Sequence, residues 1–209
     1  TKRGELQSKK ERRRVKSVLE AHQLDGAAVE PLFETIDRLH EEVKKLEKII
    51  EEKTADDPMV TLLCTIPGAG LITASTIRAF IDDIDRFARP EQLAAYAGLV
   101  PWVQNSNTTE HYGKITKRGP TELRTALVQV VLGMVRLKRM TVAYRIMLRY
   151  QRMKTAKGSG RSIIATARLL SEIIWHMLAK SEPFDELRMT DPKLFRKSME
   201  MQAAAFNVA

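Results

Sequence analysis

The sequence predicts an all-α protein, a compact helical domain that contains a helix-hairpin-helix-like motif and follows a long coiled-coil-like helical arm. Three observations predict this fold. Apolar residues recur at helical spacing through most of the 209 residues, and Pro and Gly mark the breaks between these stretches. Strand-like sequence is confined to residues 99–103 and, as a second candidate, 112–115.

The arm covers residues 1–57 and begins with a run of charges at 9–14, followed by a weak helix to about residue 24. It continues with an a/d seam flanked by Glu and Lys, made of Leu32, Ile36, Leu39, Val43, Leu46 and Ile50. The seam predicts either a homo-oligomeric coiled coil or a helix that folds back onto its own domain. Pro58 ends the arm, because the residue before a proline is disfavoured in helix.

Residues 58–190 form the predicted helical domain. Short helices are expected at 60–64 and at 71–81, the second with Ala74, Ile77 and Ile81 on one face. Another begins at Arg89-Pro90 and ends at Gly98. Two longer helices are expected at 120–138 and 139–153, and the Gly-Ser-Gly break at 158–160 separates them from a last strong helix that ends at Pro183. Residues 191–209 are expected to be a weakly helical or frayed tail.

The charge balance indicates a polyanionic partner. Lys and Arg number 35 against 26 Asp and Glu, which gives a formal net charge of +9; clustered cations of this kind bind phosphate backbones. The single cysteine, Cys64, excludes an internal disulfide and is expected to be a small buried core residue. No apolar run approaches the ~20 residues of a membrane span, so the chain is expected to be cytoplasmic, without a membrane partner.

A Pro-Gly-x-Gly turn at residues 67–70 lies between two apolar helical stretches, as in a helix-hairpin-helix. Gly68 and Gly70 allow close approach of the backbone, and the amides that open the second helix can bind a phosphate without reading sequence. A tight turn between packed helices with no ligand explains the same pattern. The nearby Asp82, Asp83 and Asp85 are expected to cap the next segment and not to hold a metal.

A polar loop around Ser106 is followed by cations and a helix that opens at Pro120. A serine hydroxyl needs activation or fixed positive charge to attack phosphorus, and these cations can supply the charge: Lys114, Lys117, Arg118 and Arg124. His111 is either a proton shuttle or, as we favour, an exposed loop histidine. Trp102 can stack on a base, although burial against the following helix is the preferred interpretation.

Three further basic residues follow later in the chain. Lys157 and Arg161, at the Gly-Ser-Gly break, are weaker candidates for phosphate contacts. Arg168 is either a phosphate ligand or the partner of Glu172 in an ion pair within one helix. No residue of the chain is predicted to bind a metal.

As an ordered set, the motifs of residues 59–180 resemble the C-terminal transposase domain of the Piv-type DEDD insertion-sequence transposases. The resemblance rests on residues 66–70, 93–101, Ser106, 115–119, 123–124 and 165–170. Asn107 stands where the family usually has Gly, and Pro120 stands where it usually has Asn. These departures affect the fine geometry of the site, whereas the order of the motifs is preserved.

The resemblance implies a DNA recombinase in which Ser106 is the nucleophile that links covalently to DNA. It implies DNA as a partner, and well-studied members also use a structured guide RNA. An N-terminal RuvC-like half with four carboxylates would bind Mg²⁺, and the sequence shows no such half. We therefore expect a C-terminal half that needs no cofactor of its own and is inactive alone. The alternative is a non-catalytic helix-hairpin-helix DNA-binding or oligomerisation module.

Overall fold

The computed structural model describes residues 8–106, 109–137, 141 and 144–185, but not the side chains of residues 103–106, 109–112 and 114. The contacts divide the chain into two compact units, residues 1–53 (the arm unit) and residues 54–209 (the helical unit). The predicted all-α class is confirmed, with one β-hairpin among the described elements. The predicted tail, residues 191–209, lies outside the described residues.

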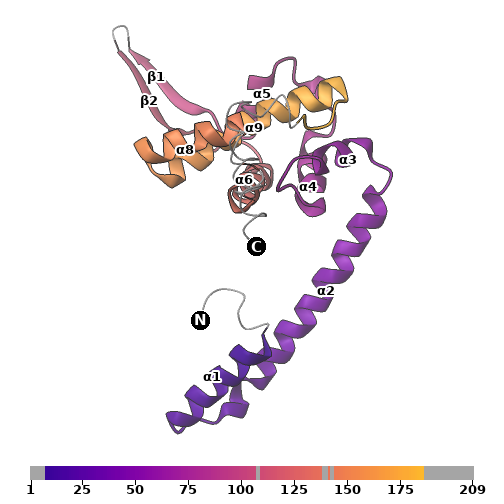
Figure 1. Ribbon diagram of the computed structural model, residues 1–209, viewed down its shortest axis with the longest axis vertical. Coiled ribbons are helices and arrows are strands. Elements are labelled where there is room, and N and C mark those ends of the chain that lie inside the picture. The colour runs from indigo at the N-terminus through magenta and orange to yellow at the C-terminus, as the bar shows by residue number, and fades with distance from the viewer. Residues whose placement is uncertain (1–7, 107–108, 138–140, 142–143, 186–209) are drawn as a thin grey trace, which may run out of the picture. The chain divides into compact units, whose positions relative to one another are not determined.

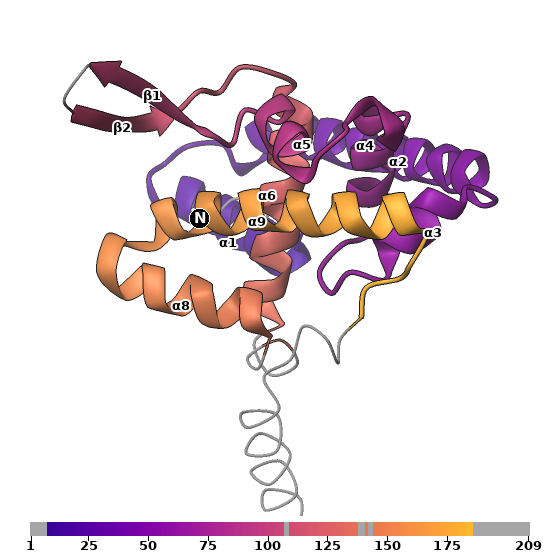
Figure 2. The same ribbon diagram turned by 90° about the horizontal axis from the view of Figure 1, so that it is seen from above.

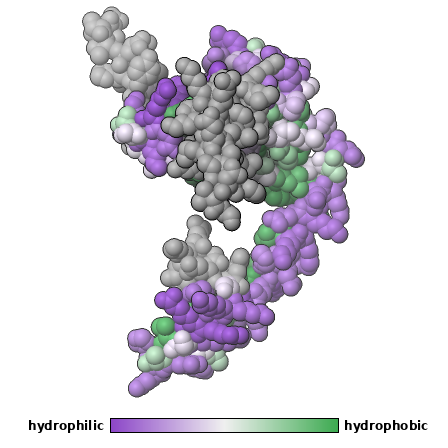
Figure 3. Space-filling view, in the orientation of Figure 1, coloured by the Kyte–Doolittle hydropathy of each residue, from purple (hydrophilic) through white to green (hydrophobic). Residues whose placement is uncertain are grey.

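The arm unit contains α1 (Lys9–Ala21), the 3-10 helix η2 (Gly26–Val29) and most of α2 (Glu30–Thr54). Arg12 of α1 donates to both carboxylate oxygens of Asp37 in α2, at 2.6 and 2.5 Å, and lies over the ring of the buried Phe33. The seam residues Leu39 and Leu46 are 58% and 59% exposed. Most of the visible face of the arm unit is hydrophilic (Figure 3).

Short elements open the helical unit. They are α3 (Pro58–Cys64), α4 (Leu71–Ile81), the 3-10 helix η3 (Ile84–Arg86) and α5 (Pro90–Tyr96). Asp57 accepts hydrogen bonds from the amides of Met59 and Val60 at the start of α3 and pairs with Arg78 of α4 at 2.8 Å. This one carboxylate therefore caps α3 and ties it to α4.

The β-hairpin, β1 (Pro101–Ser106) and β2 (Thr109–Ile115), separates these elements from α6 (Thr121–Arg136), α8 (Arg145–Lys157) and α9 (Ser159–Lys180). Helix α9 contacts α5, α6 and α8 and runs between α5 and α8 in Figure 2. One face of each of α4, α6 and α9 is buried, with Ile77, Leu127 and Leu170 at the centre of the core.

Among the described residues, α9 alone has the length and apolar composition of a membrane span. Its apolar face lies in the core of this unit, where Ala167, Leu170 and Ile174 are fully buried. The packing against α5, α6 and α8 therefore accounts for its composition.

Candidate nucleic-acid interface

The stretch that contains Ser106 forms an antiparallel hairpin. Pro101 pairs with Ile115 at its base and Ser106 pairs with Thr109 at its far end, with an irregular register between Pro101 and Val103. The two stretches with strand-like sequence are thus the two sides of one hairpin, and the residues expected as a loop extend its strands. The hairpin projects beyond the helices of its unit (Figures 1 and 2). Its backbone therefore presents Ser106 away from the core.

The basic residues predicted around Ser106 lie mainly at the other end of the hairpin. Lys117 and Arg118 follow Ile115 at the base and are exposed, and the amide of Lys117 donates to the carbonyl of Gly98 at 3.2 Å. Five residue steps of β1, at ~3.3 Å each, place the backbone of Ser106 roughly 16 Å from that base. The structure therefore brings Lys117, Arg118 and Arg124 together but not beside the backbone of Ser106.

Two glycines make the base of the hairpin possible. Gly98 and Gly119 both have positive φ, +67° and +114°. A Cβ on Gly119 would lie 1.9 Å from the carbonyl oxygen of Tyr96, and one on Gly98 would lie 2.5 Å from that of Arg118. The chain entering the hairpin and the chain leaving it therefore cross in backbone contact, which fixes the direction in which the strands leave the helices.

The guanidinium of Arg124 is bound to this crossing. Its Nη1 donates to the carbonyl oxygens of Ala97 at 3.1 Å and Lys117 at 3.4 Å, and its Nη2 donates to the hydroxyl of Thr121 at 3.2 Å. These contacts join α6 to both sides of the hairpin base. Arg124 thus has a positioning role that the sequence did not indicate.

The predicted helix-hairpin-helix turn packs against α6. Gly68 has φ +88°, and a Cβ at this position would lie 2.6 Å from the backbone nitrogen of Met134. A Cβ on Gly133 would lie 2.6 Å from the carbonyl oxygen of Gly68. Gly70 is exposed, precedes α4 and has open space at its Cβ position. Close helix packing therefore explains Gly68, whereas Gly70 and the first amides of α4 remain candidates for a phosphate contact.

Lys157 and Arg161 lie on either side of Gly158, at the turn from α8 to α9, and both are exposed. Arg168 pairs with Glu172 at 3.3 Å, which confirms the ion pair within α9. The side chains of Ser106, His111 and Lys114 lie outside the described part of the structure.

Two predictions about burial are wrong. Cys64 is exposed, because the short α3 turns Leu63 into the core instead, and partial burial raises the pKa of the Cys64 thiol. Trp102 is 49% exposed, because β1 carries it away from α6 and its indole lies over Gly113 of β2. An exposed indole on a hairpin is a surface on which a nucleic-acid base can stack.

Of the three acidic residues after α4, Asp83 caps the next segment, as predicted, whereas Asp82 and Asp85 do not. The carboxylate of Asp83 accepts from the amide of Asp85 at 2.9 Å and opens η3, while Asp82 ends α4 at φ +58°. Within residues 8–185 as far as the structure describes them, no three His, Cys, Asp or Glu side chains form a metal-binding group.

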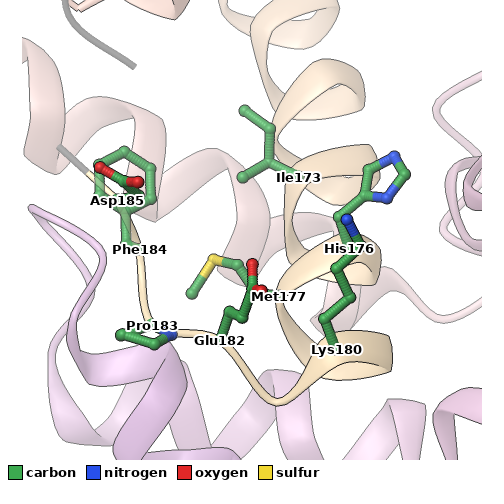
Figure 4. Close-up of a pocket in the computed structure, with 8 residues that line it drawn as sticks. All are labelled: Ile173, His176, Met177, Lys180, Glu182, Pro183, Phe184 and Asp185. Atoms are coloured by element: carbon green, nitrogen blue, oxygen red, sulfur yellow. The ribbon is translucent and has the colours of Figure 1, made fainter. Parts of the chain in front are cut away.

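A small pocket lies between α9 and the segment that follows it. Its volume is about 130 Å³, and Ile173, Met177 and Phe184 supply apolar walls beside His176 and Lys180 (Figure 4). None of the predicted site residues lines it. We therefore place the candidate interface on the hairpin, its base and the exposed helix ends.

Comparisons with known proteins show which family and which relatives parts of the chain are similar to. Residues 60–145 match the profile of the Transposase IS116/IS110/IS902 family, and this segment contains the hairpin, its base and α6. The chain is 34% identical over 121 residues to a transposase for insertion sequence element IS1111A from Coxiella burnetii. The aligned region covers 57% of this chain and 33% of that protein.

Two other relatives match a similar share of this chain. A probable family 20 transposase from Pseudomonas aeruginosa is 32% identical over 111 residues, 53% of this chain and 33% of the relative. A pilin gene-inverting protein from Moraxella lacunata is 34% identical over 127 residues, 60% of this chain and 38% of the relative. The chain thus spans about a third of the length of these curated relatives.

Proposed function

We propose, from the premise that residues 60–145 are a domain of the Transposase IS116/IS110/IS902 family, that this chain takes part in DNA transposition or site-specific recombination. The family match is the observation that carries the proposal. The net charge of +9 and the exposed cations Lys117 and Arg118 support DNA as the partner.

Ser106 is the proposed nucleophile. In the proposed step, its hydroxyl oxygen attacks a backbone phosphorus and a phosphoserine ester forms, while the bond from phosphorus to the leaving sugar oxygen breaks. The hydroxyl proton passes to a base, for which His111 is the candidate in this chain, and the sugar oxygen takes up a proton. The projecting hairpin supports this role, because it can enter a DNA-bound centre formed elsewhere in the assembly.

The basic residues at the hairpin base take a different part. Lys117 and Arg118 follow the hairpin base, whose backbone lies roughly 16 Å from that of Ser106, so we propose that they bind phosphates flanking the one that is attacked. Arg124 holds the hairpin in place through the carbonyl oxygens of Ala97 and Lys117. Among the side chains that the structure describes, these cations do not lie beside the backbone of Ser106, so we propose that groups from outside this unit neutralise the charge on the attacked phosphate.

Those groups would come from a metal-binding half. We propose that Mg²⁺ held by acidic residues of a RuvC-like half completes the centre, and that this chain alone binds DNA without cutting it. A guide RNA and a homo-oligomer formed through the seam of α2 belong to the same proposal.

The proposal is tested by trapping the covalent intermediate. The chain, joined to a metal-binding acidic half and supplied with Mg²⁺, is incubated with labelled duplex DNA that carries the element's end, and adducts are separated under denaturing conditions. We expect an adduct with the wild type and with Thr109→Ala, which removes the hydroxyl of the residue whose backbone pairs with that of Ser106. Ser106→Ala should abolish the adduct and retain DNA binding; an adduct that persists in this variant removes Ser106 from the mechanism.

A non-catalytic DNA-binding module is the second candidate. The separation between Ser106 and the cations at the hairpin base favours it, because binding alone needs no hydroxyl beside them. This candidate predicts that the joined protein binds DNA but forms no adduct with any variant.

A further inference from the structure

Helix α8 lies in a part of the sequence without acidic residues. Residues 123–171 contain no Asp or Glu, and six cations lie within residues 145–161: Arg145, Arg149, Arg152, Lys154, Lys157 and Arg161. All six are exposed. Only Lys157 and Arg161 were identified from the sequence as candidate contacts; the absence of acids was the signal that would have found the others.

The arginines of α8 form a stripe on the side opposite its core contacts. Ile146, Met147 and Tyr150 are buried. Arg145, Arg149 and Arg152 follow one another at spacings of four and three residues, so they share one face of the helix. The stripe is about 10 Å long at ~1.5 Å per residue. The visible face of α8 is mostly hydrophilic (Figure 3).

Within the described residues, these guanidinium groups make none of the ion pairs that other arginines of the helical unit make. Arg78 pairs with Asp57, and Arg168 pairs with Glu172. No described carboxylate pairs with Arg145, Arg149 or Arg152. Like charges three and four residues apart on one helix repel each other and destabilise it. A bound polyanion would remove that repulsion. A face that is only solvated gives no reason for three like charges to lie together.

We propose that the stripe of Arg145, Arg149 and Arg152 binds the phosphate backbone of duplex DNA, with Lys157 at the end of α8 extending the contact. The inference rests on the proposed function for the choice of DNA. One strand of a duplex carries a phosphate about every 3.4 Å of helix axis, so a 10 Å stripe faces roughly three phosphates. Arginine suits this role because its planar group can bind a phosphate through two donors.

The position of α8 agrees with this role. In two perpendicular views that share the horizontal axis, α8 and the hairpin extend to the same side of the helical unit, left in Figures 1 and 2. A duplex held along α8 therefore lies on the side from which Ser106 projects. The stripe would position the DNA without reading its sequence.

The test is a salt titration of binding with the 209-residue chain and a duplex of mixed sequence. The variant Arg145→Gln, Arg149→Gln and Arg152→Gln removes three charges and keeps helix-forming side chains. We expect its affinity to fall at least tenfold at low salt. The slope of log K against log salt should become shallower by about 2 to 3, since each phosphate contact contributes about 0.9.

The matched control removes three exposed cations from the arm unit, through Lys9→Gln, Arg13→Gln and Lys44→Gln. It lowers the net charge equally and should leave the slope nearly unchanged. Circular dichroism of both variants checks that helix content is retained. An equal loss in both variants would assign the binding to net charge and overturn the role of α8.

A stripe variant that binds duplex DNA like the wild type also overturns the inference. The same result follows if the variant loses affinity only for single-stranded RNA or for the acidic half added in trans, since the stripe would then serve another partner. The outcome is separable from that of Ser106. If DNA binding depends on the stripe but no serine adduct forms, this inference is supported and the proposed function is not. If an adduct forms but DNA binding does not depend on the stripe, the proposed function is supported and this inference is not.

Discussion

Nη1 of Arg124 lies 3.1 Å from the carbonyl oxygen of Ala97, a residue 27 positions earlier in the chain, and it reaches Lys117 as well. A side chain near the start of α6 thus joins the chain before the hairpin to the chain after it. Charged donors to backbone carbonyls are stronger than neutral ones. We therefore expect this contact, together with the crossing at Gly98 and Gly119, to hold the direction of the hairpin.

Replacing Arg124 should therefore affect stability before it affects DNA binding. We expect Arg124→Gln to lower the free energy of unfolding by about 1–2 kcal/mol, because a charged hydrogen bond contributes about 1.5–3 kcal/mol and this one is partly exposed. Urea denaturation measures the change. Arg118→Gln, an exposed cation of the same segment, should leave stability within about 0.5 kcal/mol and weaken DNA binding. Reversed effects for the two variants would contradict the assigned roles.

Gly133 should not tolerate a methyl group. A glycine-to-alanine change inside a helix normally stabilises by about 0.5–1 kcal/mol. Here we expect Gly133→Ala to destabilise by about 1–3 kcal/mol, because the new Cβ would lie 2.6 Å from the carbonyl oxygen of Gly68.

Gly160→Ala is the matched control for Gly133→Ala. It is also helical, with nothing within 4 Å of the added Cβ. Thermal unfolding measures the melting temperatures of both variants, and Gly133→Ala should have the lower one. Equal melting temperatures would show that the turn at Gly68 does not pack on α6 in solution.

The contact between α1 and α2 should weaken in acid. The hydrogen bond from Arg12 holds the pKa of Asp37 below its ordinary value of ~3.9. The stabilisation from this pair is therefore complete above that ordinary value and is lost as the pH falls through the lower folded pKa. An NMR titration of the Asp37 carboxyl carbon measures this pKa. We expect Arg12→Gln to raise the midpoint towards the ordinary value. An unchanged midpoint would show that the pair does not form in solution.

The seam of α2 should promote self-association. Leu39 and Leu46 are more than half exposed in the single chain, and burying such side chains at a helix pair is favourable by roughly 25 cal/mol per Å² of apolar area. We expect Leu39→Gln with Leu46→Gln to lower the mass measured by sedimentation at micromolar concentration. Val18→Gln, an exposed apolar residue of α1, should leave it unchanged. A monomeric wild type would argue for the fold-back alternative.

Local sequence patterns were sufficient to predict most of the helices. Leu71–Ile81 was predicted with its inward residues Ala74, Ile77 and Ile81, all fully buried, because helical spacing and the flanking Gly70 and Asp82 act within one segment. The hairpin was only partly predicted. Polar residues such as Asn105 and Thr109 suggest a loop, and pairing between strands overrides that preference.

The all-α class, most helix positions, the basic charge and the order of the motifs around Ser106 could be predicted without coordinates, because each depends on residues close together in the chain. The folded chain was needed to show that Arg124 serves the hairpin base, that Gly68 contacts Gly133, and that Trp102 and Cys64 are exposed. The physical reason is that burial and hydrogen-bond partners depend on segments tens of residues apart, and no local spacing specifies which of them meet.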